Sequence, residues 1–244
     1  MARRPIEGLI TDATIQSKEL NEDIPLLIYT PPNFTPLKSY DLLICQDGHD
    51  YFQIGRIPRV VEALIDEAEI RETIIVGVPY PSVQERRKRY HPDGEKMPAY
   101  IRFLTNELVP YIDEHYPTHE LASGRTLAGD SLAATVSLMA ALKYPNLFGQ
   151  VMMHSPYVDD KVLAAIAECK QPEALSLYHV IGIHETAVDT TDGKTLDFVE
   201  PNRKMNEHLS KLPFTYTYDE FDGDHTWKYW QKDLQRGLTT LIPF

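Results

Sequence analysis

The 244-residue sequence contains only two cysteines, Cys45 and Cys169, and no run of about 18 apolar residues that could cross a bilayer. No apolar segment follows Arg3 and Arg4, so a secretory signal is not predicted. Two cysteines without such a signal predict reduced thiols in a cytoplasmic protein rather than a disulfide framework. Cys45 ends the apolar run 42–45 and is expected to be a small core residue.

Positive charge is scarce as well. The chain has 24 Lys and Arg residues against 36 Asp and Glu residues, which gives a formal net charge of −12. Nucleic acids and anionic membranes are bound through Lys and Arg, so neither is predicted as a partner. No His-Glu-x-x-His segment occurs, and the acidic residues around 189–193 are too sparse for a calcium loop. We therefore expect no metal site, while the oligomeric state stays open.

Short apolar segments alternate with helical patterns along the chain. The segments 42–45, 73–78 and 150–153 are apolar nearly throughout, which is typical of strands buried on both faces of a parallel sheet. Apolar residues three and four positions apart predict an amphipathic helix over 99–115. The other predicted elements are strands at 126–128, 175–183 and 214–218 and helices at 59–68 and 132–142.

Two strand-like segments, 9–20 and 24–29, come before this alternation and predict an antiparallel edge on the sheet. The alternation itself predicts an α/β fold with a mostly parallel central sheet and helices on both faces. We expect one domain over residues 1–244. The polar stretches 81–97 and 185–201 are predicted to be long loops, and long ordered loops often carry function.

The strongest chemical signal is the segment Gly-Asp-Ser-Leu-Ala at residues 129–133, between a predicted strand and a predicted helix. A serine on such a strand-to-helix turn is lifted out of the sheet and can act as a nucleophile. Only small residues fit two positions before and after it, and Gly129 and Ala133 meet that requirement. The helix N-terminus also favours negative charge developing at Ser131. Ser131 is therefore the predicted nucleophile, with an ordinary helix cap by Asp130 or Ser131 as the alternative.

A histidine follows the last predicted strand, in the segment Asp-Gly-Asp-His-Thr-Trp at residues 222–227. α/β hydrolases carry their active-site residues in the order serine, acid, histidine, with the histidine after the last strand. Histidine suits a general base because its pKa lies near neutrality. We therefore predict that His225 is the general base. Taken alone, it has the alternative role of a surface residue that caps the final helix.

The acid is expected after the strand that ends near residue 183. Glu185 is the first candidate and Asp189 the second, and the sequence does not separate them. A carboxylate there would hold the tautomer of His225 and stabilise its protonated form.

An oxyanion hole requires two N–H groups near the nucleophile. One is expected from the residue after the serine, Leu132, and the other from the loop after an early central strand. That loop reads Gln-Asp-Gly-His-Asp at residues 46–50, where Gly48 allows a tight turn and His49 is the predicted second donor. The alternative is a plain Asp-Gly turn.

In these segments the chain is similar to the Putative esterase family of α/β hydrolases, which includes enterochelin esterases, feruloyl esterases and esterase D. Four ordered segments carry the likeness, and they span most of the chain: 43–48; 75–78 with Arg86 and Tyr90; 129–134 with 144–148 and 155–156; and 182–185 with 223–230. The resemblance implies the α/β-hydrolase fold, a Ser-His-acid triad and hydrolysis of an ester without metal or organic cofactor.

The chain departs from the family pattern at three positions. Ala133 replaces the usual glycine, Arg89 stands where a glutamate often precedes Tyr90, and Asp224 stands where many members have glycine. The arginine-to-glutamate contact typical of the family is therefore in doubt.

The expected substrate is a small-molecule ester, siderophore-like or otherwise. Siderophore esterases favour large anionic substrates, and the segment 85–89 could supply positive charge. The predicted substrate-binding residues are Arg86, Tyr90, Tyr157 and Trp227, with a solvated basic loop and core aromatics as the alternative. An acyltransferase with the same triad and a non-catalytic binding protein are the other functions considered.

Overall fold

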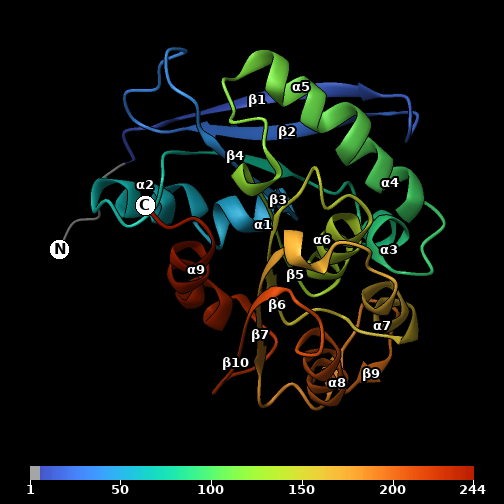
Figure 1. The fold of residues 1–244 in the computed structure, drawn as a ribbon. Coiled ribbons are helices and arrows are strands. Elements are labelled where there is room, and N and C mark those ends of the chain that lie inside the picture. The colour runs from blue at the N-terminus through green and yellow to red at the C-terminus, as the bar shows by residue number, and fades with distance from the viewer. Residues whose placement is uncertain (1–5) are drawn as a thin grey trace.

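The computed structural model describes residues 6–244, so the expectation about Arg3 and Arg4 lies outside the described residues. Eight strands form one sheet in the order β1-β2-β4-β3-β5-β6-β7-β10 (Figure 1). They are β1 (Leu9–Ser17), β2 (Glu22–Thr30), β3 (Asp41–Gln46), β4 (Thr73–Val78), β5 (Arg125–Asp130), β6 (Gln150–His154), β7 (Ser176–Gly182) and β10 (Thr215–Phe221). A small separate hairpin joins β8 (Val188–Asp189) to β9 (Thr195–Leu196).

The direction of the strands changes near the N-terminal edge of the large sheet. β1 pairs antiparallel with β2, and β2 pairs antiparallel with β4. From β4 to β10 every pairing is parallel. β3, β4, β5 and β6 are buried at every residue, which agrees with the apolar segments 42–45, 73–78 and 150–153 of β3, β4 and β6. The predicted mostly parallel sheet with antiparallel N-terminal strands is therefore confirmed.

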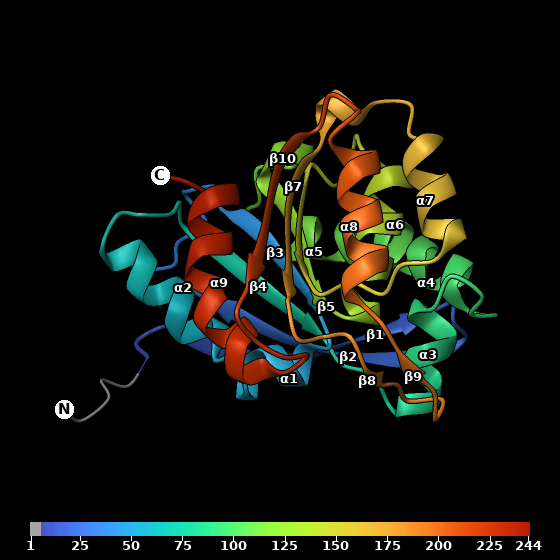
Figure 2. The same ribbon diagram turned by 90° about the horizontal axis from the view of Figure 1, so that it is seen from below.

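Helices cover both faces of the sheet, as Figure 2 shows from the side. One face carries α1 (Gly48–Gln53), α2 (Ile57–Asp66) and α9 (Trp227–Leu241). The other face carries α3 (Val83–Tyr90), α4 (Met97–Phe103), α5 (Val109–His115), α6 (Leu132–Lys143), α7 (Asp160–Ala167) and α8 (Val199–Leu209). The architecture agrees with the predicted α/β-hydrolase type.

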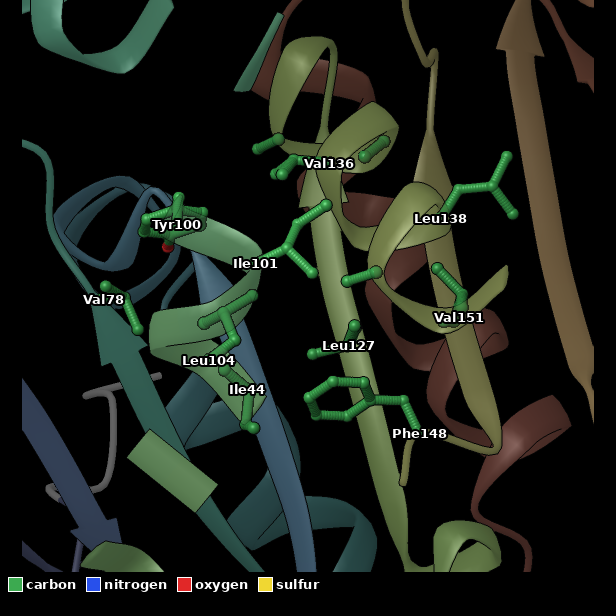
Figure 3. Close-up of a cluster of buried hydrophobic side chains, with 14 of the residues drawn as sticks. Ile44, Val78, Tyr100, Ile101, Leu104, Leu127, Val136, Leu138, Phe148 and Val151 are labelled. Atoms are coloured by element: carbon green, nitrogen blue, oxygen red, sulfur yellow. The ribbon is translucent and has the colours of Figure 1, made fainter. Parts of the chain in front are cut away.

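Each central strand contributes side chains to two cores, because successive residues of a strand point to opposite faces. Ile44 of β3 and Leu127 of β5 enter the larger core, where Figure 3 shows them beside Phe148. Cys45 and Ala128, the next residue of each strand, enter the smaller core under α1, α2 and α9. Cys45 is a fully buried free thiol, so its predicted place in the core is correct.

The stretch 81–97 is not the loop that its polarity predicted, because it contains α3. This helix is highly charged and shows no apolar face, so hydrophobic periodicity could not reveal it. A capping signal could have done so: Ser82 Oγ accepts a hydrogen bond from the backbone N–H of Glu85 at 3.2 Å, as in a Ser-x-x-Glu capping box. Three basic residues in the last turn also stabilise the helix, because their charge is opposite to the negative end of the helix dipole. The second predicted loop, 185–201, contains the β8–β9 hairpin and the start of α8.

The predicted helix 99–115 is observed, with a π-helical turn over Leu104–Leu108 between α4 and α5. This turn ends two residues before Pro110, which has no N–H to donate to the preceding turn. Among residues 6–244, no helix has both the length and the apolar character needed to span a membrane.

Candidate active site

Four loops converge at the carboxyl ends of the parallel strands, the edge of an open α/β sheet where ligands bind. Asp47 follows β3 and Ser131 follows β5, while Glu185 and His225 lie on the loops after β7 and β10. A cavity of about 1010 Å³ opens at this edge and is lined by Ser131, Leu132 and His225, among others. The structure thus brings Ser131, Glu185 and His225, which come from segments far apart in the chain, to one edge of the sheet.

Ser131 occupies a strained turn between β5 and α6. Its backbone has φ 53° and ψ −126°, a region that non-glycine residues rarely adopt. The turn is held because the Ser131 N–H donates to the carbonyl of His154 at 2.9 Å. Strain of this kind is common at functional sites, and here it lifts the serine above the sheet at the mouth of the cavity.

The residue two positions before the serine has no room for a side chain. A Cβ on Gly129 would lie 2.2 Å from the carbonyl carbon of Ala133 and 2.4 Å from the backbone nitrogen of Ala134. These are backbone atoms of α6, which cannot move aside without shifting the helix. The size restriction inferred from the sequence at Gly129 is therefore a direct steric consequence of the turn.

Replacing Gly129 with alanine should lower the free energy of unfolding by about 1–3 kcal/mol, as overpacking does, and should reduce any activity of Ser131. Urea denaturation of both proteins measures the first effect. Gly193→Ala is the comparison: nothing lies within 4 Å of a Cβ there, and only its left-handed φ of 80° opposes the change. A smaller loss at position 129 than at position 193 would contradict the steric account.

His225 is bonded to Glu185. Nδ1 of His225 lies 2.6 Å from Oε2 of Glu185, and the side chain of Glu185 is fully buried. The other carboxylate oxygen, Oε1, accepts hydrogen bonds from Ser155 Oγ at 2.6 Å and from the Gly182 N–H at 2.8 Å. Both oxygens of the buried carboxylate are thus satisfied, and the position of its plane relative to the imidazole ring is fixed.

Asp189, the second candidate for the acid, lies elsewhere. It is exposed on β8, where it accepts a hydrogen bond from Thr195 Oγ1 at 2.7 Å. Asp189 lines the outer part of the cavity. The structure brings Glu185, rather than Asp189, to His225.

Aromatic rings hold the imidazole of His225 in place. The Phe198 ring centroid lies 4.6 Å from it, and the Trp230 ring meets it edge-on at 4.9 Å. Trp230 also donates from Nε1 to Ser155 Oγ at 3.0 Å, which extends the hydrogen-bond chain behind Glu185. Sequence reasoning assigned no role to Ser155, Phe198 or Trp230. The available signal was the position of Trp230 in the first turn of α9, five residues after His225.

The structure places the two predicted oxyanion-hole residues differently. Leu132 is the first residue of α6 and lines the cavity. His49 is the second residue of α1, and its side chain is exposed and does not line the cavity. The turn before it is tight, because a Cβ on Gly48 would lie 2.5 Å from the carbonyl carbon of Gly77. A role for the His49 N–H stays a prediction.

Arg86 ties the turn after β3 to the turn after β5. Its Nε and Nη2 donate to the Asp47 carboxylate at 2.8 and 2.6 Å, and Nη2 also reaches the backbone carbonyl of Asp130 at 3.4 Å. Asp47 has a left-handed φ of 53°. Arg86 lines the cavity, and its Nε and Nη2 are engaged by these partners. Its contacts suit it to position the two loops around Ser131.

The remaining predicted substrate-binding residues fall into two groups. Tyr157 and Trp227 line the cavity. Tyr90 is fully buried beneath Arg86, with the guanidinium carbon 5.6 Å from its ring centre, and does not line the cavity. Arg89, which stands where the family often has a glutamate, is buried and forms an ion pair with Glu22 of β2 at 2.8 Å.

Negative charge is costly in the inner part of the cavity. Burial, and next the neighbouring Asp47 carboxylate, raise the pKa of Asp130 well above its usual range. The same two causes, in the same order, raise the pKa of Asp50. In residues 6–244, no three His, Cys, Asp or Glu side chains gather as a metal site requires.

Comparisons with known proteins agree on one family. The model of a family described as Putative esterase matches residues 17–241. The Bacillus subtilis (strain 168) protein described as uncharacterized protein YjcH is 54% identical over 238 residues, which cover 98% of this chain and 99% of the relative.

Two solved structures are similar in fold. A ferulic acid esterase has a TM-score of 0.81 and 17% identity, with 98% of this chain and 99% of that chain covered. The enterobactin esterase from Shigella flexneri, solved in the presence of enterobactin, has a TM-score of 0.84 and 18% identity. That likeness covers 98% of this chain but 60% of the longer esterase.

Proposed function

We propose that this chain, which belongs to the Putative esterase family, hydrolyses small-molecule carboxylic esters with Ser131 as nucleophile, His225 as general base and Glu185 as the acid. One observation carries the proposal: His225, bonded through Nδ1 to a buried carboxylate, lines the same cavity as a serine on a strained strand-to-helix turn. A buried carboxylate on Nδ1 leaves Nε2 as the nitrogen that can accept a proton.

The first half of the reaction forms an acyl-enzyme. Nε2 of His225 removes the proton of the Ser131 hydroxyl as its oxygen attacks the ester carbonyl carbon. The charge that develops on the carbonyl oxygen is stabilised by the N–H of Leu132 at the start of α6 and by a second N–H from the turn after β3, for which His49 is the proposed donor. The protonated His225 then donates its proton to the departing alcohol.

The second half releases the acid. A water molecule gives a proton to His225 and attacks the acyl carbonyl, and Ser131 recovers its proton from the imidazole. Glu185 stabilises the imidazolium at both stages, because its carboxylate is bonded to Nδ1. The wide cavity leaves space for both the acyl and the alcohol parts of a small ester.

Hydrolysis of p-nitrophenyl acetate and butyrate by the purified protein tests the proposal. We expect turnover that falls by at least about 10³-fold in Ser131→Ala. Ser123→Ala, an exposed serine in the short helix Ala122–Gly124 far from the cavity, is the matched control and should retain activity. Equal rates in Ser131→Ala and the parent protein would contradict the proposal, as would transfer of the acyl group to an alcohol without any hydrolysis.

A further inference from the structure

We infer that the cavity selects esters that carry no negative charge and discriminates against anionic ones, an inference that rests on the proposed function. The likeness to an enterobactin esterase and the basic residues of α3 would lead to the opposite expectation, a site for a large anion. The contacts of the basic residues argue against a site for an anion.

Every Lys and Arg that lines the cavity is already paired with a carboxylate of the protein. Arg86 holds Asp47 at 2.6 Å, and Arg87 holds Asp192 at 2.9 Å. Lys88 lies 3.1 Å from Glu85 and 3.2 Å from Glu95, and Lys194 lies 3.3 Å from Asp192. Among residues 6–244, an anionic substrate in the cavity would therefore have to break or share an existing ion pair to reach a Lys or Arg.

Carboxyl side chains outnumber Lys and Arg side chains among the residues that line the cavity. Within residues 6–244, three of these carboxyl groups, those of Asp50, Asp130 and Asp189, form no ion pair with Lys or Arg. Asp50 and Asp130 lie on the inner side, on α1 and directly before the nucleophile. Asp189 lies on the outer hairpin. A ligand in the cavity therefore meets carboxyl groups that no Lys or Arg of the described residues pairs with.

The burial and the pKa of Asp130 indicate that an anion is unfavourable in this part of the cavity. Asp130 is buried, with 6% of its surface exposed, and its Oδ1 has no hydrogen-bond partner among the described residues. Burial and the neighbouring Asp47 carboxylate raise the pKa of Asp130 and of Asp50. The ionised form of each group is therefore less favourable here than it would be in water. The same surroundings would oppose a carboxylate, sulfonate or phosphate of a substrate.

Three p-nitrophenyl esters with equal chain length test this inference. Each acyl group is a butyryl chain that ends in tert-butyl, trimethylammonium or sulfonate, so shape is nearly constant while the charge changes. We expect kcat/KM, corrected for the rate of each ester with hydroxide, to be at least about tenfold lower for the sulfonate than for the other two at low salt. The difference should shrink as ionic strength rises, because salt screens the charges.

Asp50→Asn tests the source of the discrimination. This variant should raise kcat/KM for the sulfonate ester relative to the tert-butyl ester. Asp12→Asn, on exposed strand β1, changes the net charge equally and should leave that ratio as it is. A sulfonate ester that is hydrolysed as well as the tert-butyl ester would overturn the inference and leave the proposed function intact. If none of the three esters is hydrolysed, the proposed function itself fails and the inference falls with it.

Discussion

Alanine at Ser131 or at His225 should each lower kcat for ester hydrolysis by at least about 10³-fold, and the double variant should lose little more than either single variant. The reason is that the two side chains act in one step. Without His225 the serine hydroxyl keeps its proton, and without Ser131 the imidazole has no nucleophile to activate. Steady-state rates on p-nitrophenyl butyrate for the four proteins measure this coupling.

The control for this experiment is a histidine outside the cavity. His208 is half-buried on α8 and does not line the cavity, and its Nδ1 lies 2.8 Å from the carbonyl of Lys204. His208→Ala should keep full activity. That result would show that the loss in His225→Ala does not follow from removing any histidine. Losses that multiply in the double variant would mean that Ser131 and His225 act independently, which contradicts their proposed roles.

Replacing Glu185 with glutamine should lower kcat by about 10³ to 10⁴-fold, the scale of loss known for the corresponding change in a serine protease triad. The hydrogen bonds around Glu185 explain why so similar a side chain should fail. Oε1 accepts from two donors, Ser155 Oγ and the Gly182 N–H, so the amide NH₂ of glutamine cannot take that place. The amide nitrogen would instead face Nδ1 of His225 and favour the wrong tautomer.

Asp189→Asn is the matched comparison, since it also exchanges a carboxylate for an amide at a residue lining the cavity. Asp189 is exposed and bonded to Thr195, so this change should alter kcat by less than about threefold. The same esterase assay on both variants separates the two candidates. A larger loss in Asp189→Asn than in Glu185→Gln would reassign the acid.

Much of the fold follows from local patterns in the sequence. Apolar segments such as 73–78 could only be buried strands, and the two strands before the alternation formed the expected antiparallel edge. The family and the class of enzyme, a carboxylic-ester hydrolase, were also predicted and are confirmed by the family match. These features depend on residue type and order, which the sequence displays directly.

Features that depend on contacts between distant segments were harder to predict. α3 was missed because charged residues give no hydrophobic period, although its Ser82 cap was readable. Arg86 was predicted to bind substrate, but only the folded chain shows that Asp47 and the Asp130 carbonyl occupy it. The chain from Trp230 through Ser155 to Glu185 joins residues up to 75 positions apart, and no local pattern indicates it.

Fluorophosphonate labelling with peptide mass spectrometry tests the central claim most directly, because the reagent bonds covalently to an activated serine. The account predicts a single label on the peptide that contains Ser131, absent from Ser131→Ala and strongly slowed in His225→Ala. A label on another residue, a label that persists in Ser131→Ala, or a protein that takes up no label would contradict Ser131 as the nucleophile.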